Sequence, residues 1–113
     1  QEGDLIVSHA EKFSRTPNAA AGAAAFWFQS FALPSGLVKP FKVLCQAHTH
    51  QFGMTFGNYG IWNLECGCLC KMPDYAANPK LMGSNRPSTL GYTVIYQKNG
   101  VTDMKKTRLI PIL

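Results

Sequence analysis

Short apolar runs separated by turn-forming residues are the feature that most limits how this chain can fold. Glycine and proline account for 10 and 7 of its 113 residues, and they recur between runs too short for long helices. The clearest unit lies near the end, where residues 92–98 and 101–110 are rich in β-forming residues and flank Asn99-Gly100. This dipeptide favours a type I′ turn and predicts a β-hairpin. Several such strands indicate an all-β fold, either a β-sandwich or a small barrel.

One segment near the N-terminus departs from the β pattern. Thr16 can cap a helix whose first residue is Pro17, and the alanine-rich run that follows favours the helical state. We therefore expect one short helix over residues 17–25, leading into a strand over residues 26–33, where aromatic side chains are frequent. The chain has the length of one domain, so we expect residues 1–113 to form a single domain.

Alternation of apolar and polar residues predicts two strands around the cysteines. From Phe41 onward the odd-numbered residues are the more apolar set and include Cys45, whereas His48 and His50 belong to the even-numbered set. Because successive side chains of a strand point to opposite faces, we expect the sulfur to face the interior and the histidines to face water. The same alternation over residues 62–72 places the other three cysteines on one apolar face.

The four cysteines are disulfide candidates, and we expect a disulfide-stabilised fold. Thiols two residues apart on an extended strand are poorly placed to bond, because their Cα atoms are about 6.5–7 Å apart and their Cβ directions are parallel. We therefore expect a cross-strand bond from Cys45 to one of the others, or two bonds if the chain turns at Gly67. A zinc site built from three or four thiols is the alternative. The candidates are Cys45, Cys66, Cys68 and Cys70.

A second group of candidate metal ligands follows Cys45. His48 and His50 offer two imidazole nitrogens, and Met54 lies four residues after His50. The spacing Cys45-x4-His50-x3-Met54 resembles the ligand loop of azurin-type cupredoxins. This resemblance implies copper ligands at those three residues and a further imidazole from His9. In cupredoxins the loop lies near the C-terminus, whereas here a long segment follows it.

The run HTHQFG over residues 48–53 is also similar to the HTHxxG copper motif of peptidylglycine and dopamine monooxygenases. This second resemblance implies copper ligands at His48 and His50. Each resemblance covers about ten residues, and the alternative interpretation is a pair of surface histidines on a polar strand face.

The net charge of +5 is concentrated in the last third of the chain. Acidic and basic residues balance over residues 1–70, and the excess lies in residues 71–113. A basic region of this kind can bind an anionic surface or an acidic partner, or it can simply keep the protein in solution. Tyr92 and Tyr96 lie nearby, but we do not expect nucleic-acid binding. The candidate basic surface comprises Lys98, Lys105, Lys106 and Arg108.

The sequence offers little that is typical of an enzyme. It has six acidic residues, which do not cluster, and it lacks a P-loop and a serine nucleophile elbow. Cys45 with a neighbouring histidine is the one local pairing of a nucleophile and a base, and its expected inward orientation argues against that role. We therefore expect no catalytic residues and no cofactor.

These observations favour a non-enzymatic, exported binding or assembly protein. Such a protein would be a secreted effector, a defence protein, or a subunit of a larger surface or viral particle, with a protein or anionic surface as partner or with self-assembly. The cysteine content and the start at Gln1 favour an extracellular or periplasmic location, and no apolar run reaches membrane-spanning length. The alternative is a small copper- or zinc-binding protein that uses His48, His50, Met54 and the cysteines.

Overall fold

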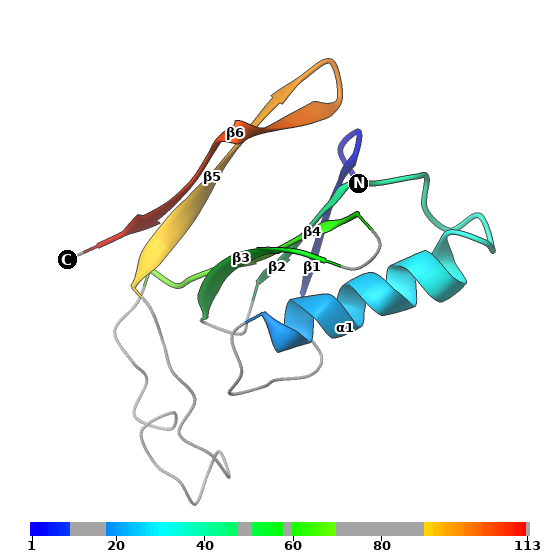
Figure 1. The fold of residues 1–113 in the computed structure, drawn as a ribbon, viewed down its shortest axis with the longest axis horizontal. Helices are drawn as coiled ribbons and strands as arrows, with labels where there is room; N and C mark the ends of the chain where they lie inside the picture. Colours follow the sequence, from blue (N-terminus) through cyan, green and yellow to red (C-terminus); the bar gives the residue numbers. More distant parts are fainter. Residues whose placement is uncertain (10–17, 48–50, 58–59, 70–89, 113) are drawn as a thin grey trace, which may run out of the picture.

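A four-stranded sheet lies between one helix and a two-stranded hairpin in the computed structural model, as Figure 1 shows. The expected mostly β composition with one short helix is confirmed. None of the described helices is long and apolar enough to cross a membrane. The structure describes residues 1–9, 18–47, 51–57, 60–69 and 90–112.

The sheet is mixed, with strands in the order β1-β2-β4-β3. Strands β1, β2 and β4 are parallel, and β3 is antiparallel to β4. Helix α1 lies in the connection between the parallel strands β1 and β2, which need a crossover of this kind. The elements are β1 (Leu5–His9), α1 (Ala19–Trp27), the π-helical turn η1 (Phe28–Ala32), β2 (Val43–Ala47), β3 (Phe52–Phe56), β4 (Trp62–Cys66), β5 (Gly91–Lys98) and β6 (Val101–Pro111).

Both faces of the sheet are covered, each by a different element. On one face, Ile6 and Leu44 pack with Ala25 of α1. On the other face, Leu64 belongs to a cluster that Ile95 of the hairpin covers. The clusters are Ile6, Ala25, Phe41, Leu44 and Ile61 on the helix face, and Leu5, Val43, Cys45 and Leu64 on the hairpin face.

Burial on both faces overturns one expectation about strand β2. The even-numbered face of residues 41–50 was expected to meet water, but Leu44 and Gln46 are only 0% and 5% exposed. Helix α1 covers this face, as parallel strands in a βαβ unit require. Alternation correctly predicted the odd-numbered face, where Val43 and Cys45 are buried.

The predicted helix is confirmed, but the strand expected over residues 26–33 is wrong. The helical backbone continues from α1 through η1 to Ala32. Phe28 makes edge-to-face contacts with Trp27, at 5.1 Å between ring centroids, and with Phe41, at 6.3 Å. These aromatic contacts on the helix favour a conformation that β propensity alone does not predict.

The predicted hairpin is confirmed, together with its turn. Asn99 and Gly100 have φ values of 53° and 77°, as a type I′ turn requires, and Lys98 pairs with Val101. The turn packs against the N-terminal segment, where the Asp4 backbone N–H donates to the Gly100 carbonyl at 2.9 Å. A side chain at Gly3 would collide with Gly100, so this contact requires glycine.

The Asp4 carboxylate fastens the same two segments. It accepts hydrogen bonds from the Thr102 backbone N–H at 3.0 Å and from the Thr102 hydroxyl at 2.6 Å. We expect Asp4→Ala to lower the free energy of unfolding by about 2 kcal/mol, because hydrogen bonds to a charged acceptor are lost. Asp103→Ala is the control, since Asp103 accepts an exposed hydrogen bond from a residue two positions away. Urea denaturation measures the free energy of unfolding of both variants. Equal losses in the two variants would contradict a stabilising role of the Asp4 hydrogen bonds.

Candidate functional site

The carboxyl ends of β1 and β2 lie side by side and form one end of the candidate site. The two strands are parallel, and His9 is in register with Ala47. His48 and His50 follow Ala47 by one and three residues in the sequence and lie outside the described residues. His9 therefore lies beside Ala47, the residue that precedes His48 in the sequence.

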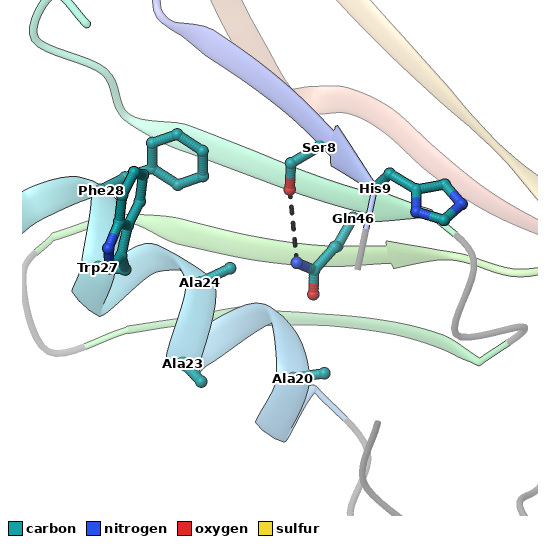
Figure 2. Close-up of a pocket in the computed structure, with 8 residues that line it drawn as sticks. All are labelled: Ser8, His9, Ala20, Ala23, Ala24, Trp27, Phe28 and Gln46. Atoms are coloured by element: carbon teal, nitrogen blue, oxygen red, sulfur yellow. Dashed lines mark hydrogen bonds between the residues drawn. The ribbon is translucent and has the colours of Figure 1, made fainter. Parts of the chain in front are cut away.

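A cavity of about 360 Å³ lies beside His9, between α1 and the sheet (Figure 2). Ala20, Ala23 and Ala24 line this space from the α1 side, and their short side chains leave it open. Among the described lining residues, the helix side is mainly apolar and the strand side is polar. The lining residues are Ala20, Ala23, Ala24, Trp27 and Phe28 from the helical segment, and Ser8, His9 and Gln46 from the strands.

Gln46 is the buried polar residue of this cavity. It is in register with Ser8 on one side and Glu65 on the other. Its Nε2 donates to the Ser8 hydroxyl at 3.4 Å, whereas its Oε1 accepts no hydrogen bond from the described residues. Figure 2 shows the Gln46 amide directed from the sheet toward α1. A buried oxygen without a donor is unfavourable, so this position is suited to a hydrogen-bond donor from outside the protein.

Glu65 anchors the start of α1 next to the cavity. Its side chain is 0% exposed, and its Oε2 accepts a hydrogen bond from the Asn18 backbone N–H at 2.8 Å. Asn18 precedes the helix and has a φ of 63°. A carboxylate at this position interacts favourably with the N-terminal end of the helix dipole. Glu65 therefore fixes the helix that forms one wall of the cavity.

The thiols of Cys45 and Cys66 meet on the opposite face of the sheet. The Cys45 thiol donates a hydrogen bond to Cys66, and this bond lowers the pKa of Cys66 from 9.0 to about 7. The same hydrogen bond, together with burial, raises the pKa of Cys45. A thiolate is the reactive form of cysteine, so Cys66 is the more reactive member of the pair.

The expected disulfide is not present in the described part of the chain. Cys45, Cys66 and Cys68 carry free thiols, and Cys70 lies outside the described residues. Cys66 is a cross-strand neighbour of Cys45, but the two thiols are hydrogen-bonded and are not joined by a disulfide. Alternation fails after Cys66 because Gly67, at φ 79°, turns the backbone out of the extended conformation.

The thiol pair predicts a specific pH dependence of alkylation. We expect the rate of iodoacetamide labelling at Cys66 to rise as the pH increases through about 7, because the thiolate forms around that pH. Peptide mapping by mass spectrometry assigns the label. In Cys45→Ala the donor is lost, so the midpoint for Cys66 should move toward 9.0. A midpoint near 9 in the unaltered protein would contradict the hydrogen-bonded pair.

Met54 is poorly placed to share a metal ion with His9. Met54 lies in β3 and His9 in β1, the two edge strands of the sheet. With β2 and β4 between them, these edges are about 14 Å apart. The cupredoxin resemblance required both residues around one copper, and the sheet order does not bring them together. Met54 instead packs against the cluster that contains Cys45 and Leu64.

The candidate basic residues lie on the hairpin, away from the cavity. Lys98, Lys105, Lys106 and Arg108 are all exposed. The Lys106 Nζ lies 4.3 Å from the centroid of the Tyr96 ring, a cation–π distance. Arg108 donates to the Lys105 carbonyl at 2.9 Å. These contacts are local to the hairpin.

Sequence reasoning missed the polar residues beneath α1. Ser8, Gln46 and Glu65 gave no signal, because only the parallel pairing of β1, β2 and β4 places them in one row. Among the described residues, no three histidine, cysteine, aspartate or glutamate side chains are grouped to hold a metal ion. Searches against protein-family models, curated proteins and solved structures find no match.

Proposed function

We propose that the protein binds a divalent transition metal, zinc or copper, through His9, His48 and His50. The observation that supports this proposal is the parallel register of His9 with Ala47, one residue before His48. Imidazole nitrogen is a preferred ligand of both metals. Three imidazoles leave one position of a tetrahedral ion for water or another ligand.

This proposal differs from the two copper resemblances in its ligand set. Met54 is not included, because the sheet separates it from His9. The thiols of Cys45 and Cys66 are not included either, because they pack against the hairpin as part of a largely apolar cluster. Of the proposed ligands, His9 is the last residue of β1, and His48 and His50 follow the last residue of β2 in the sequence.

Equilibrium dialysis against Zn²⁺ and Cu²⁺, followed by metal analysis, tests the proposal. We expect about one ion of either metal per chain, as a single three-histidine site would hold. Less than about a tenth of an ion per chain with both metals would overturn it, because even a weak specific site fills at dialysis concentrations above its Kd.

A second candidate function is docking of a protein partner or self-assembly, as an exported subunit. Four large apolar side chains around α1 and the segment after it support this candidate: Phe26, Trp27, Phe31 and Leu37 are 49–73% exposed. Exposed apolar side chains that cluster favour protein contacts. Under this proposal the hairpin and the larger sheet act as a small β-sandwich whose helix side meets the partner.

Light scattering at increasing protein concentration tests for self-assembly. We expect the mass to rise with concentration and Phe31→Ser to suppress this rise, because Phe31 is 58% exposed. Val101→Ser, which also replaces a 58% exposed apolar residue, is the matched control on the hairpin. A constant monomer mass would rule out self-assembly in solution.

A further inference from the structure

The cavity beneath α1 has the size and lining of a small-molecule site. Its volume of about 360 Å³ falls in the range of about 300–1,000 Å³ that is typical of ligand pockets. A water molecule occupies about 30 Å³ in the liquid, so water filling this space would lie largely against apolar walls. Apolar walls with few polar groups are the usual composition of a ligand pocket.

Among the described lining residues, the polar side chains of the strand side are those of Ser8, His9 and Gln46, and the helix side adds only the indole N–H of Trp27. Gln46 is 5% exposed, and its Oε1 accepts no hydrogen bond from the described residues while its Nε2 is engaged with Ser8. An occupant can therefore satisfy the buried oxygen with a hydroxyl or N–H group. Across the cavity, Ala20, Ala24 and Trp27 offer contacts to an apolar body.

The position of the cavity in the fold supports the same conclusion. It lies beside Ser8 and Gln46, near the carboxyl ends of the parallel strands β1 and β2. In open sheets with parallel strands, ligands bind outside the carboxyl ends of the strands. Glu65 holds the beginning of α1 through Asn18, so the wall opposite the strands is fixed in place.

We propose that this cavity binds a small, mainly apolar molecule, such as a ring compound, that carries a hydroxyl or N–H group donating to Gln46 Oε1. The orphaned oxygen of Gln46 and the apolar wall of α1 are the two independent observations behind it. The proposal does not depend on the metal site, and it holds for metal-free protein.

Phenol and toluene are suitable probes, because they have the same shape and differ in a hydroxyl against a methyl group. Their titration into metal-free, ¹⁵N-labelled protein, followed by amide chemical shifts, gives both the affinity and the location. We expect saturable shifts with millimolar dissociation constants, confined to residues near Ser8, α1 and Gln46. Absence of saturable shifts with phenol, or shifts confined to the hairpin face, would overturn the proposal.

The Gln46→Leu variant tests the hydrogen bond apart from the cavity. We expect toluene to bind this variant at least as well as the unaltered protein. The ratio of phenol affinity to toluene affinity should fall about five-fold, as the loss of one neutral hydrogen bond predicts. An unchanged ratio would show that Gln46 Oε1 does not receive the ligand.

A pair of alanine substitutions tests the cavity itself. Ala20→Leu fills the space, because Ala20 is buried and lines the cavity, and we expect it to weaken binding of both probes at least ten-fold. Ala19→Leu is the matched control, since Ala19 is exposed on the same helix and does not line the cavity. Equal binding by the two folded variants, checked by their amide spectra, would place the probes elsewhere.

Discussion

Replacing Leu64 with alanine is expected to lower the free energy of unfolding by about 3–5 kcal/mol. Leu64 is 0% exposed and lies in β4, which pairs with β2 on one side and β3 on the other. Its side chain is part of the cluster that the hairpin covers. The substitution removes apolar contacts and leaves a cavity that β4 cannot close, because both neighbouring strands hold it in place.

Chemical denaturation with urea, followed by circular dichroism, measures this loss. Leu37→Ala is the matched control, since Leu37 is 73% exposed and its truncation should change stability by less than about 0.5 kcal/mol. A domain of this size has a total stability of about 5–15 kcal/mol, so the Leu64 variant should be partly unfolded at low urea. If Leu64→Ala lost as little stability as Leu37→Ala, the hairpin would not bury this face.

Replacing His9 with alanine is expected to weaken Zn²⁺ binding by about 100-fold or more. Losing a residue that only supports a ligand already costs about 10–100-fold in affinity, and His9 is proposed as a ligand itself. The expected cause is the loss of one of the three proposed imidazole ligands, the one at the end of β1. Isothermal titration calorimetry of the unaltered and variant proteins measures the change.

Two controls separate the imidazole site from the thiols and from misfolding. The double variant Cys45→Ala, Cys66→Ala should keep its Zn²⁺ affinity, because these thiols lie on the hairpin face and are not proposed ligands. Without metal, the free energy of unfolding of His9→Ala should stay within about 1 kcal/mol of that of the unaltered protein, as expected for a residue at a strand end. If the thiol variant loses the metal and the His9 variant retains it, the ligand assignment is wrong.

The parts of the fold that could be predicted from sequence depend on local chemistry. Asn99-Gly100 favours one turn type because both residues tolerate a positive φ, and the observed values of 53° and 77° agree. Alanine favours helix locally, so the sequence predicts the helical conformation that the structure has over residues 19–25. Each of these elements is determined by residues close together in the chain.

The parts that could not be predicted depend on contacts between distant segments. The parallel pairing of β1 with β2 cannot be read from sequence periodicity. Alternation predicts that Gln46 on β2 faces solvent, whereas α1 covers this side chain in the structure. The helical path of residues 28–32 similarly depends on the contact of Phe28 with Phe41. Tertiary packing decides these elements, so local propensity gives the wrong answer.

The candidate site also has parts that could be predicted from local sequence and parts that depend on contacts between distant segments. His48 and His50 were recognisable as a pair because they are two residues apart in sequence. The cupredoxin resemblance implied a second imidazole from His9 beside that of His50, and the register of β1 with β2 places His9 beside Ala47, which precedes His48 in the sequence. Met54 shows the limit of this reasoning, because only the order of strands in the sheet separates it from His9.

The hydrogen bonds between Asp4 and Thr102 join residues 98 positions apart. During synthesis on the ribosome, β1 and β2 emerge long before β6 is made, so the first segment waits for most of the chain before this contact can form. Contacts between such distant residues form slowly, because a large loop must close first. Until then the apolar face around Val43 and Leu64 lacks the cover of the hairpin, and exposed apolar surface of this kind favours aggregation.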